Sequence, residues 1–135
     1  MTGQYKQAVE SLDIAERLRP SYKHIYYQRG TILNMAGDYP RAQKDFDIAV
    51  KREPEFSKAW YNRGINYKDM EKFRRAINDF NKAIELDPSN GEAYMARGAC
   101  YLNINKKKEG AEDMKRAVEI GIGEATILFD RFCRD

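Results

Sequence analysis

The chain has 135 residues, which is enough for one domain with a modest core. Charged residues make up 33% and hydrophobic residues 42%, a balance that excludes a disordered chain, and no apolar run is long enough to span a membrane. The 24 basic and 21 acidic residues give a formal charge of +3 that is spread thinly along the chain, which argues against a nucleic-acid partner.

The sequence repeats with a period of 34 residues. An aromatic side chain followed three residues later by Arg-Gly recurs at Arg29-Gly30, Arg63-Gly64 and Arg97-Gly98. A fixed period of this length is typical of stacked supersecondary units, each of which buries its apolar surface against its neighbours.

Residues 1–22 are predicted to be the second helix of an incomplete repeat, because their apolar positions recur 34 residues later. Without a first helix, Ala8, Leu12 and Ala15 would face an absent partner, so this strip is a candidate edge for self-association. The alternative is a frayed, partly solvated end helix.

Residues 23–56, 57–90 and 91–124 are predicted to be three full repeats of two helices each. Residues 73–86, for example, place apolar side chains at the i, i+3, i+4 and i+7 spacing of one helical stripe. We expect Gly30, Gly64 and Gly98 to lie where two helices cross closely, because glycine has no Cβ. Only the first copy has a glycine, Gly37, in the turn between its helices.

Residues 125–135 are predicted to form a C-terminal capping helix. Gly121 and Gly123 end the helix before it. We expect Ile127, Leu128 and Phe132 to shield the last repeat, so the whole chain forms one domain.

These columns resemble the tetratricopeptide repeat, with its aromatic, Gly, Ala, Phe and Pro positions. The resemblance covers residues 1–124 and implies an all-α fold, a right-handed α-solenoid of helix-turn-helix repeats. It also implies a non-catalytic scaffold that binds a protein or peptide. Arg29, Arg63 and Arg97 stand where the pattern prefers Leu, and we expect their stems to cover apolar surface while their charged heads reach solvent.

The sequence offers no catalytic, metal or cofactor site. His24 has no nucleophile partner and is expected to be solvated or to touch a ligand, Cys100 is expected to fill the core, and Cys133 has no metal-type spacing. Two cysteines make no disulfide framework, which favours a cytoplasmic compartment. The acidic pairs Asp45/Asp47 and Glu112/Asp113 are expected to be solvated.

A ligand would bind along the first helix of each repeat, which lines the concave side of such a solenoid. The candidate groove residues share an orientation away from the packed face: His24, Tyr27, Gln28, Thr31, Lys58, Tyr61, Asn62, Ile65, Lys68 and Met95. Tyr27 and Tyr61 could instead merely line the inner wall, and the module could instead assemble with further copies of itself.

Family members that bind chaperone tails use a clamp of Lys, Asn and Arg side chains for two carboxylates. The resemblance places Asn62 at one clamp position. Glu92 and Ala96 stand where the clamp needs Lys and Arg, and Glu92 would repel a carboxylate. We therefore expect no such clamp in these three repeats.

Overall fold

The computed structural model describes residues 2–22 and 24–133, and within them all regular structure is helical. The all-α fold predicted from the sequence is confirmed. The helices follow one another in the order α1 (Gly3–Leu18), α2 (Ile25–Met35), α3 (Tyr39–Arg52), α4 (Ser57–Asp69), α5 (Phe73–Leu86), α6 (Gly91–Asn103), α7 (Lys107–Ile120) and α8 (Gly123–Phe132).

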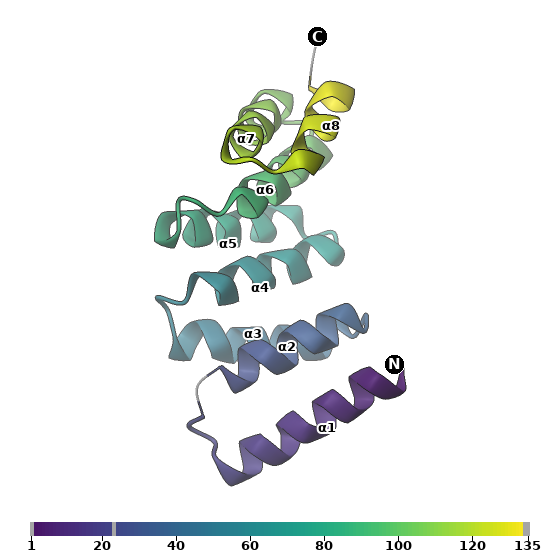
Figure 1. Cartoon of the computed structure of the whole chain (residues 1–135), viewed down its shortest axis with the longest axis vertical. Helices are drawn as coiled ribbons and strands as arrows, with labels where there is room; N and C mark the ends of the chain where they lie inside the picture. The colour runs from purple at the N-terminus through teal and green to yellow at the C-terminus, as the bar shows by residue number, and fades with distance from the viewer. Residues whose placement is uncertain (1, 23, 134–135) are drawn as a thin grey trace.

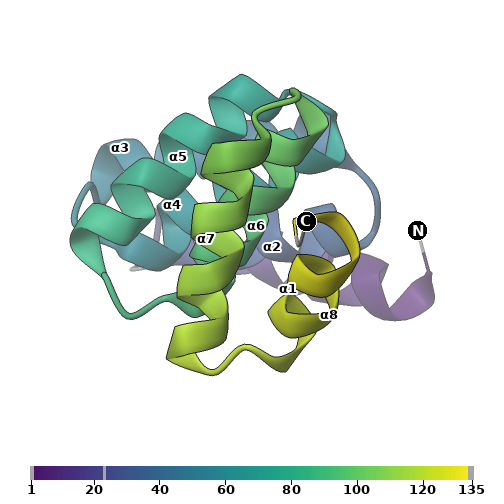
Figure 2. The same ribbon diagram turned by 90° about the horizontal axis from the view of Figure 1, so that it is seen from above.

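The helices stack in chain order into a solenoid (Figure 1). Helix α2 packs on α3, α4 on α5 and α6 on α7, while α1 packs on α2 and α8 on α7. Helices α2, α4 and α6 also contact one another from repeat to repeat. Seen from above, α3, α5 and α7 lie on one side of these three helices (Figure 2). Helix α8 lies beside α7, on the side away from α3 and α5. The helices α2, α4 and α6 therefore form the inner layer.

The glycine columns lie where the sequence predicts close helix crossings. A Cβ on Gly30 would lie 2.9 Å from the ring of Phe46, and a Cβ on Gly64 would lie 2.6 Å from the ring of Phe80. At Gly98 a Cβ would meet the Cβ of Asp113 at 3.0 Å. Both phenylalanines are fully buried, so the missing Cβ atoms let the second helix of each repeat pack directly against the first.

The turn between the two helices has the same backbone conformation in every repeat. Gly37 has φ +81°, and the residues 34 and 68 positions later, Glu71 and Asn105, have φ 59° and 63°. This left-handed region is normally left to glycine, or to Asn and Asp, because a Cβ crowds the backbone there. The stacking of the repeats therefore imposes a glycine-like turn on Glu71.

Two of the three residues expected to shield the last repeat, Ile127 and Phe132, are exposed. Ile127 is 60% exposed and Phe132 is 51% exposed, whereas Ala125 and Cys133 are buried against Met114 and Ala117 of α7. The face of α8 that meets the last repeat is thus rotated from the expected one. Only Leu128, of the three residues expected to shield the repeat, packs against this cluster.

None of the helices within residues 2–22 and 24–133 combines the length and the apolar character that crossing a bilayer requires.

Candidate functional site

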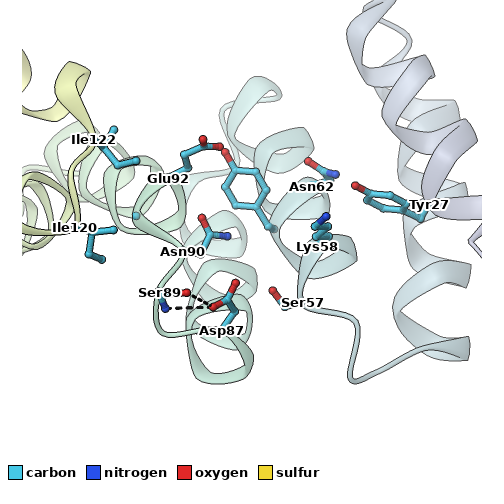
Figure 3. A pocket seen from close by; sticks show the side chains of 12 residues that line it. Tyr27, Ser57, Lys58, Asn62, Asp87, Ser89, Asn90, Glu92, Ile120 and Ile122 are labelled. Carbon is cyan, nitrogen blue, oxygen red and sulfur yellow. Dashed lines mark hydrogen bonds between the residues drawn. The ribbon is translucent and has the colours of Figure 1, made fainter.

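A cavity of about 430 Å³ opens on the inner layer, between α4 and the loops that precede α6 and α8 (Figure 3). Tyr27, Lys58 and Asn62 lie on one side, and Glu92 and Ile122 lie on the other. The remaining lining comes from α4, the α5–α6 loop and the ends of α6 and α7: Ser57, Tyr61, Asp87, Ser89, Asn90, Gly91 and Ile120.

A second cavity of about 480 Å³ adjoins the first and shares Tyr61, Glu92 and Ile122 with it. Met95 of α6 and Glu124 of α8 complete its walls, together with Gly121 and Gly123. Burial raises the pKa of the Tyr61 phenol to about 12, and the nearby Glu92 carboxylate adds to this rise. Tyr61 therefore lies between a buried environment and the acidic side chain of Glu92.

The wall made by the α7–α8 connection depends on Gly91. A Cβ at that position would lie 2.6 Å from Ile122 and 2.9 Å from Ile120. Because Gly91 is the first residue of α6, the connection can approach α6 closely there. This approach places Ile122 in the wall of both cavities. It also brings Glu124 into the same cavity as Glu92.

A ring contact and two hydrogen bonds position the side chains at the Tyr27 end of the first cavity. The Tyr27 ring packs edge-on against Phe56, with 4.9 Å between ring centroids. The Thr31 hydroxyl donates to the Tyr27 carbonyl at 2.8 Å, and the Asn62 amide donates to the Thr31 oxygen at 3.4 Å. Adjacent repeats are therefore linked across the groove floor, which limits the freedom of Asn62.

The structure brings together about half of the predicted groove residues. Tyr27, Lys58, Tyr61 and Asn62 line the first cavity, and Met95 lines the second. The other residues predicted from the sequence lie outside these two cavities: His24, Gln28, Thr31, Ile65 and Lys68.

His24 and Ile65 have structural contacts. The His24 Nδ1 atom lies 2.9 Å from a Glu53 carboxylate oxygen, and its ring lies 4.3 Å from that of Phe56. The His24 side chain is nevertheless 33% exposed, so its contact with a ligand stays a prediction. Ile65 packs against the buried cluster around Phe80.

The predicted self-association edge lies on α1. Ala8, Leu12 and Ala15 are half-buried, and Val9 is the buried residue of this helix. Ile14 and Leu18 of the same helix are 49% and 76% exposed. Helix α1 therefore presents apolar side chains to solvent beside the predicted edge.

A ladder of ion pairs was missed by the sequence analysis. The guanidinium groups of Arg29, Arg63 and Arg97 each donate two hydrogen bonds of 2.7–2.9 Å to the carboxylate of an aspartate 16 residues later. These partners are buried, so the expectation that Asp45 and Asp113 are solvated is wrong, as is the expectation that the arginine heads reach solvent. The partners are Asp45, Asp79 and Asp113, which are 5%, 3% and 5% exposed.

The same arginines also reach back into the preceding repeat. A third nitrogen of each donates to a residue 16 positions earlier, at 2.8 Å, 3.0 Å and 2.8 Å. The acceptors are Asp13, Asp47 and Asn81. Each arginine therefore links three helices. The constant spacing of 16 residues between each arginine and its partners is the sequence signal that predicts these contacts.

The thiols are poorly suited to nucleophilic chemistry. Cys100 is fully buried, and burial raises its pKa to about 11. Burial also raises the pKa of Cys133. A thiol held protonated is a weak nucleophile. Across residues 2–22 and 24–133, no group of three or more His, Cys, Asp or Glu side chains is placed to hold a metal ion.

Comparison with solved structures gives the same architecture. MamA 41-end from Desulfovibrio magneticus RS-1 has a TM-score of 0.82 at 26% identity, over 87% of this chain and 67% of that one. The first TPR of Spaghetti (RPAP3), bound to the HSP90 peptide SRMEEVD, has a TM-score of 0.77 at 26% identity, over 80% of this chain and 87% of that one. A further MamA crystal structure has a TM-score of 0.83 at 25% identity, over 92% and 72% of the two chains.

Family models match most of the chain. No curated protein gives a significant sequence match. Tetratricopeptide-repeat models match residues 2–42, 36–65, 57–90 and 80–112, and the matches together extend from residue 2 to residue 112. With the stacked helix pairs and the glycine columns, these matches show that the chain belongs to the tetratricopeptide repeat family.

Proposed function

We propose that this chain is a non-catalytic scaffold that binds an extended peptide or protein segment along the inner layer of α2, α4 and α6. The observation that carries the proposal is the 430 Å³ cavity lined by Tyr27, Lys58, Tyr61 and Asn62. The Spaghetti domain, which shares the fold, is described with a peptide bound. A concave surface with a few polar groups among aromatic side chains is typical of a recognition site.

Each groove residue has a distinct role in this proposal. The rings of Tyr27 and Tyr61 supply rigid contact area, and such rings are enriched among residues that dominate binding energy. The Asn62 amide can hydrogen-bond an extended backbone. The exposed Lys58 ammonium suits a carboxylate of the bound segment.

The test is a library of random nine-residue peptides, with the affinity of the best binders measured by fluorescence polarisation. Tyr61→Ala and Asn62→Ala should each weaken binding about tenfold or more, corresponding to about 1.4 kcal/mol. Asn78→Ala, on the exposed face of α5, is the matched control and should change nothing. If no peptide binds in a manner sensitive to Tyr61 and Asn62, the groove proposal is wrong.

Self-assembly through α1 is the second candidate. The supporting observation is the half-buried strip of Ala8, Leu12 and Ala15 next to the exposed side chains of Ile14 and Leu18. An apolar edge of this kind can pair with another copy of the chain. Leu12→Asp should then reduce the mass measured by sedimentation equilibrium, and an unchanged mass would remove the support for this candidate.

A further inference from the structure

The two sides of the groove differ in charge. Lys58 of α4 lies on one side of the first cavity, and Asp87 and Glu92 line the other side. The second cavity adds Glu124 to Glu92 and contains no basic residue. Neither Glu92 nor Glu124 forms an ion pair with a residue of 2–22 or 24–133.

The second cavity is also amphipathic. Its acidic groups stand beside Met95, Ile122 and the ring of Tyr61. A long basic side chain has the same division, since an aliphatic stem carries a cationic head. An aromatic face adds attraction for such a head when the cation lies within about 6 Å of the ring.

We propose that the segment bound in the groove inserts an Arg or Lys side chain into the second cavity, between the carboxylates of Glu92 and Glu124. This inference rests on the proposed peptide-binding function and names the chemistry of its ligand. The stem packs on Met95 and Ile122, the head meets the two carboxylates, and an acidic group of the same segment faces Lys58. The bound segment is therefore of mixed charge, with its basic residue toward α8.

Charge complementarity selects this occupant over an acidic tail. Glu92 and Glu124 are both exposed, and two carboxylates in one cavity repel a bound carboxylate and attract a cation. Glu92 and Glu124 lie in the first turns of α6 and α8, where an acidic side chain also favours the helix dipole. That structural role affects helix stability and leaves the choice of peptide unaffected, so binding and stability measurements separate the two roles.

The experiment screens a position-scanned nine-residue peptide library against the folded chain and then measures the best binder by fluorescence polarisation. We expect Arg or Lys to be enriched at one position. Replacing that residue by neutral citrulline or norleucine should weaken binding about tenfold. Glu92→Gln and Glu124→Gln should each weaken the basic peptide about fivefold and leave the neutral peptide unchanged.

Two further variants sharpen the result. Glu92→Lys should reverse the preference, so that peptides with Asp or Glu at that position bind more tightly than those with Arg. Glu112→Gln, on an exposed part of α7 outside both cavities, is the matched control and should change neither affinity. Circular dichroism and thermal unfolding of each variant separate a loss of recognition from a loss of folding.

The outcomes are distinguishable. If binders depend on Tyr61 and Asn62 but show no basic preference, or if Glu92→Gln leaves the basic peptide unaffected, this inference is overturned while the groove proposal stands. If no binder depends on Tyr61 and Asn62, the groove proposal fails and this inference fails with it. If Glu92→Gln instead changes the mass of the peptide-free protein, the occupant is a second copy of the chain and the peptide ligand is refuted.

Discussion

Substituting Arg63 by Leu, the residue that the family pattern prefers there, should destabilise this protein strongly. Asp79 is 3% exposed, and its two carboxylate oxygens accept hydrogen bonds from Arg63 at 2.8 Å and 2.9 Å. Burial raises the pKa of the Asp79 carboxyl, and the Arg63 guanidinium opposes that rise. Without the guanidinium, a buried carboxylate would have lost its main counter-charge.

The expected loss is about 3–5 kcal/mol in the free energy of unfolding, the usual effect of removing one partner of a buried ion pair. Such a loss is a large part of the 5–15 kcal/mol that typically stabilises a domain. Asp79→Ala should cost less, because Arg63 keeps its contact with Asp47 at 3.0 Å. The double variant should lose much less than the sum of the single variants, since neither charge is then left unpaired.

Urea unfolding followed by circular dichroism at pH 7 measures all four proteins of this cycle. The Arg63→Leu variant should also regain stability on acidification, because a buried Asp79 with a raised pKa can then be protonated in the folded state. Lys82→Ala, which removes an exposed contact with Glu85 at 3.6 Å, should cost less than about 0.5 kcal/mol. Additive single effects, or a loss below about 1 kcal/mol for Arg63→Leu, would show that the ladder does not stabilise the fold.

Three further substitutions probe the packing, the turn and the buried thiol. Gly64→Ala should cost about 1–3 kcal/mol of unfolding free energy in urea, because the new Cβ would lie 2.6 Å from Phe80, whereas Gly3→Ala, with nothing within 4 Å, should cost nothing. Glu71→Gly should raise the unfolding free energy by about 1 kcal/mol by relieving a φ of 59°, and an unchanged midpoint in urea would contradict this. Because burial raises the pKa of Cys100 to about 11, its contribution to stability should be complete below about pH 8.5 and fall by about 1.4 kcal/mol per pH unit between there and pH 11, where the folded thiol also loses its proton. A Cys100→Ala variant that kept the same slope would refute this assignment.

Much of the fold was predictable because its signals are local or strictly periodic. A helical stripe such as 73–86 requires only the spacing of apolar residues along one segment. The glycine column required only the 34-residue period and the absence of a Cβ, and Gly30 and Gly64 indeed lie against buried phenylalanine rings.

The ion-pair ladder was missed because its partners lie on different helices. Arg63 and Asp79 are 16 residues apart, on α4 and α5, and a single-helix pattern cannot join them. Each residue taken alone is polar and would be placed at the surface. Only the joint recurrence of Arg and Asp in all three repeats distinguishes a buried pair from two solvated charges.

The capping helix shows a second limit. Helix α8 has ten residues and carries Ile127, Leu128, Phe129 and Phe132, so apolar side chains occur on more than one of its faces. Periodicity then does not decide which face is buried. The contact with α7 decides it, through Ala125 and Cys133, which are small enough to let the two helices approach.

The columns that stabilise the solenoid and those that face the groove behave differently along the chain. The Arg, Gly and Asp columns are identical in all three repeats, because each repeat must meet the next in the same way. The column at the start of the first helix of each repeat reads His24, Lys58 and Glu92. Packing does not require these three side chains to differ. His24 contacts Glu53, whereas Lys58 and Glu92 line the cavity. The change from Lys58 to Glu92 therefore gives the inner layer a direction in charge that the repeated columns lack, and in the proposed complex this direction would select one orientation of the bound segment.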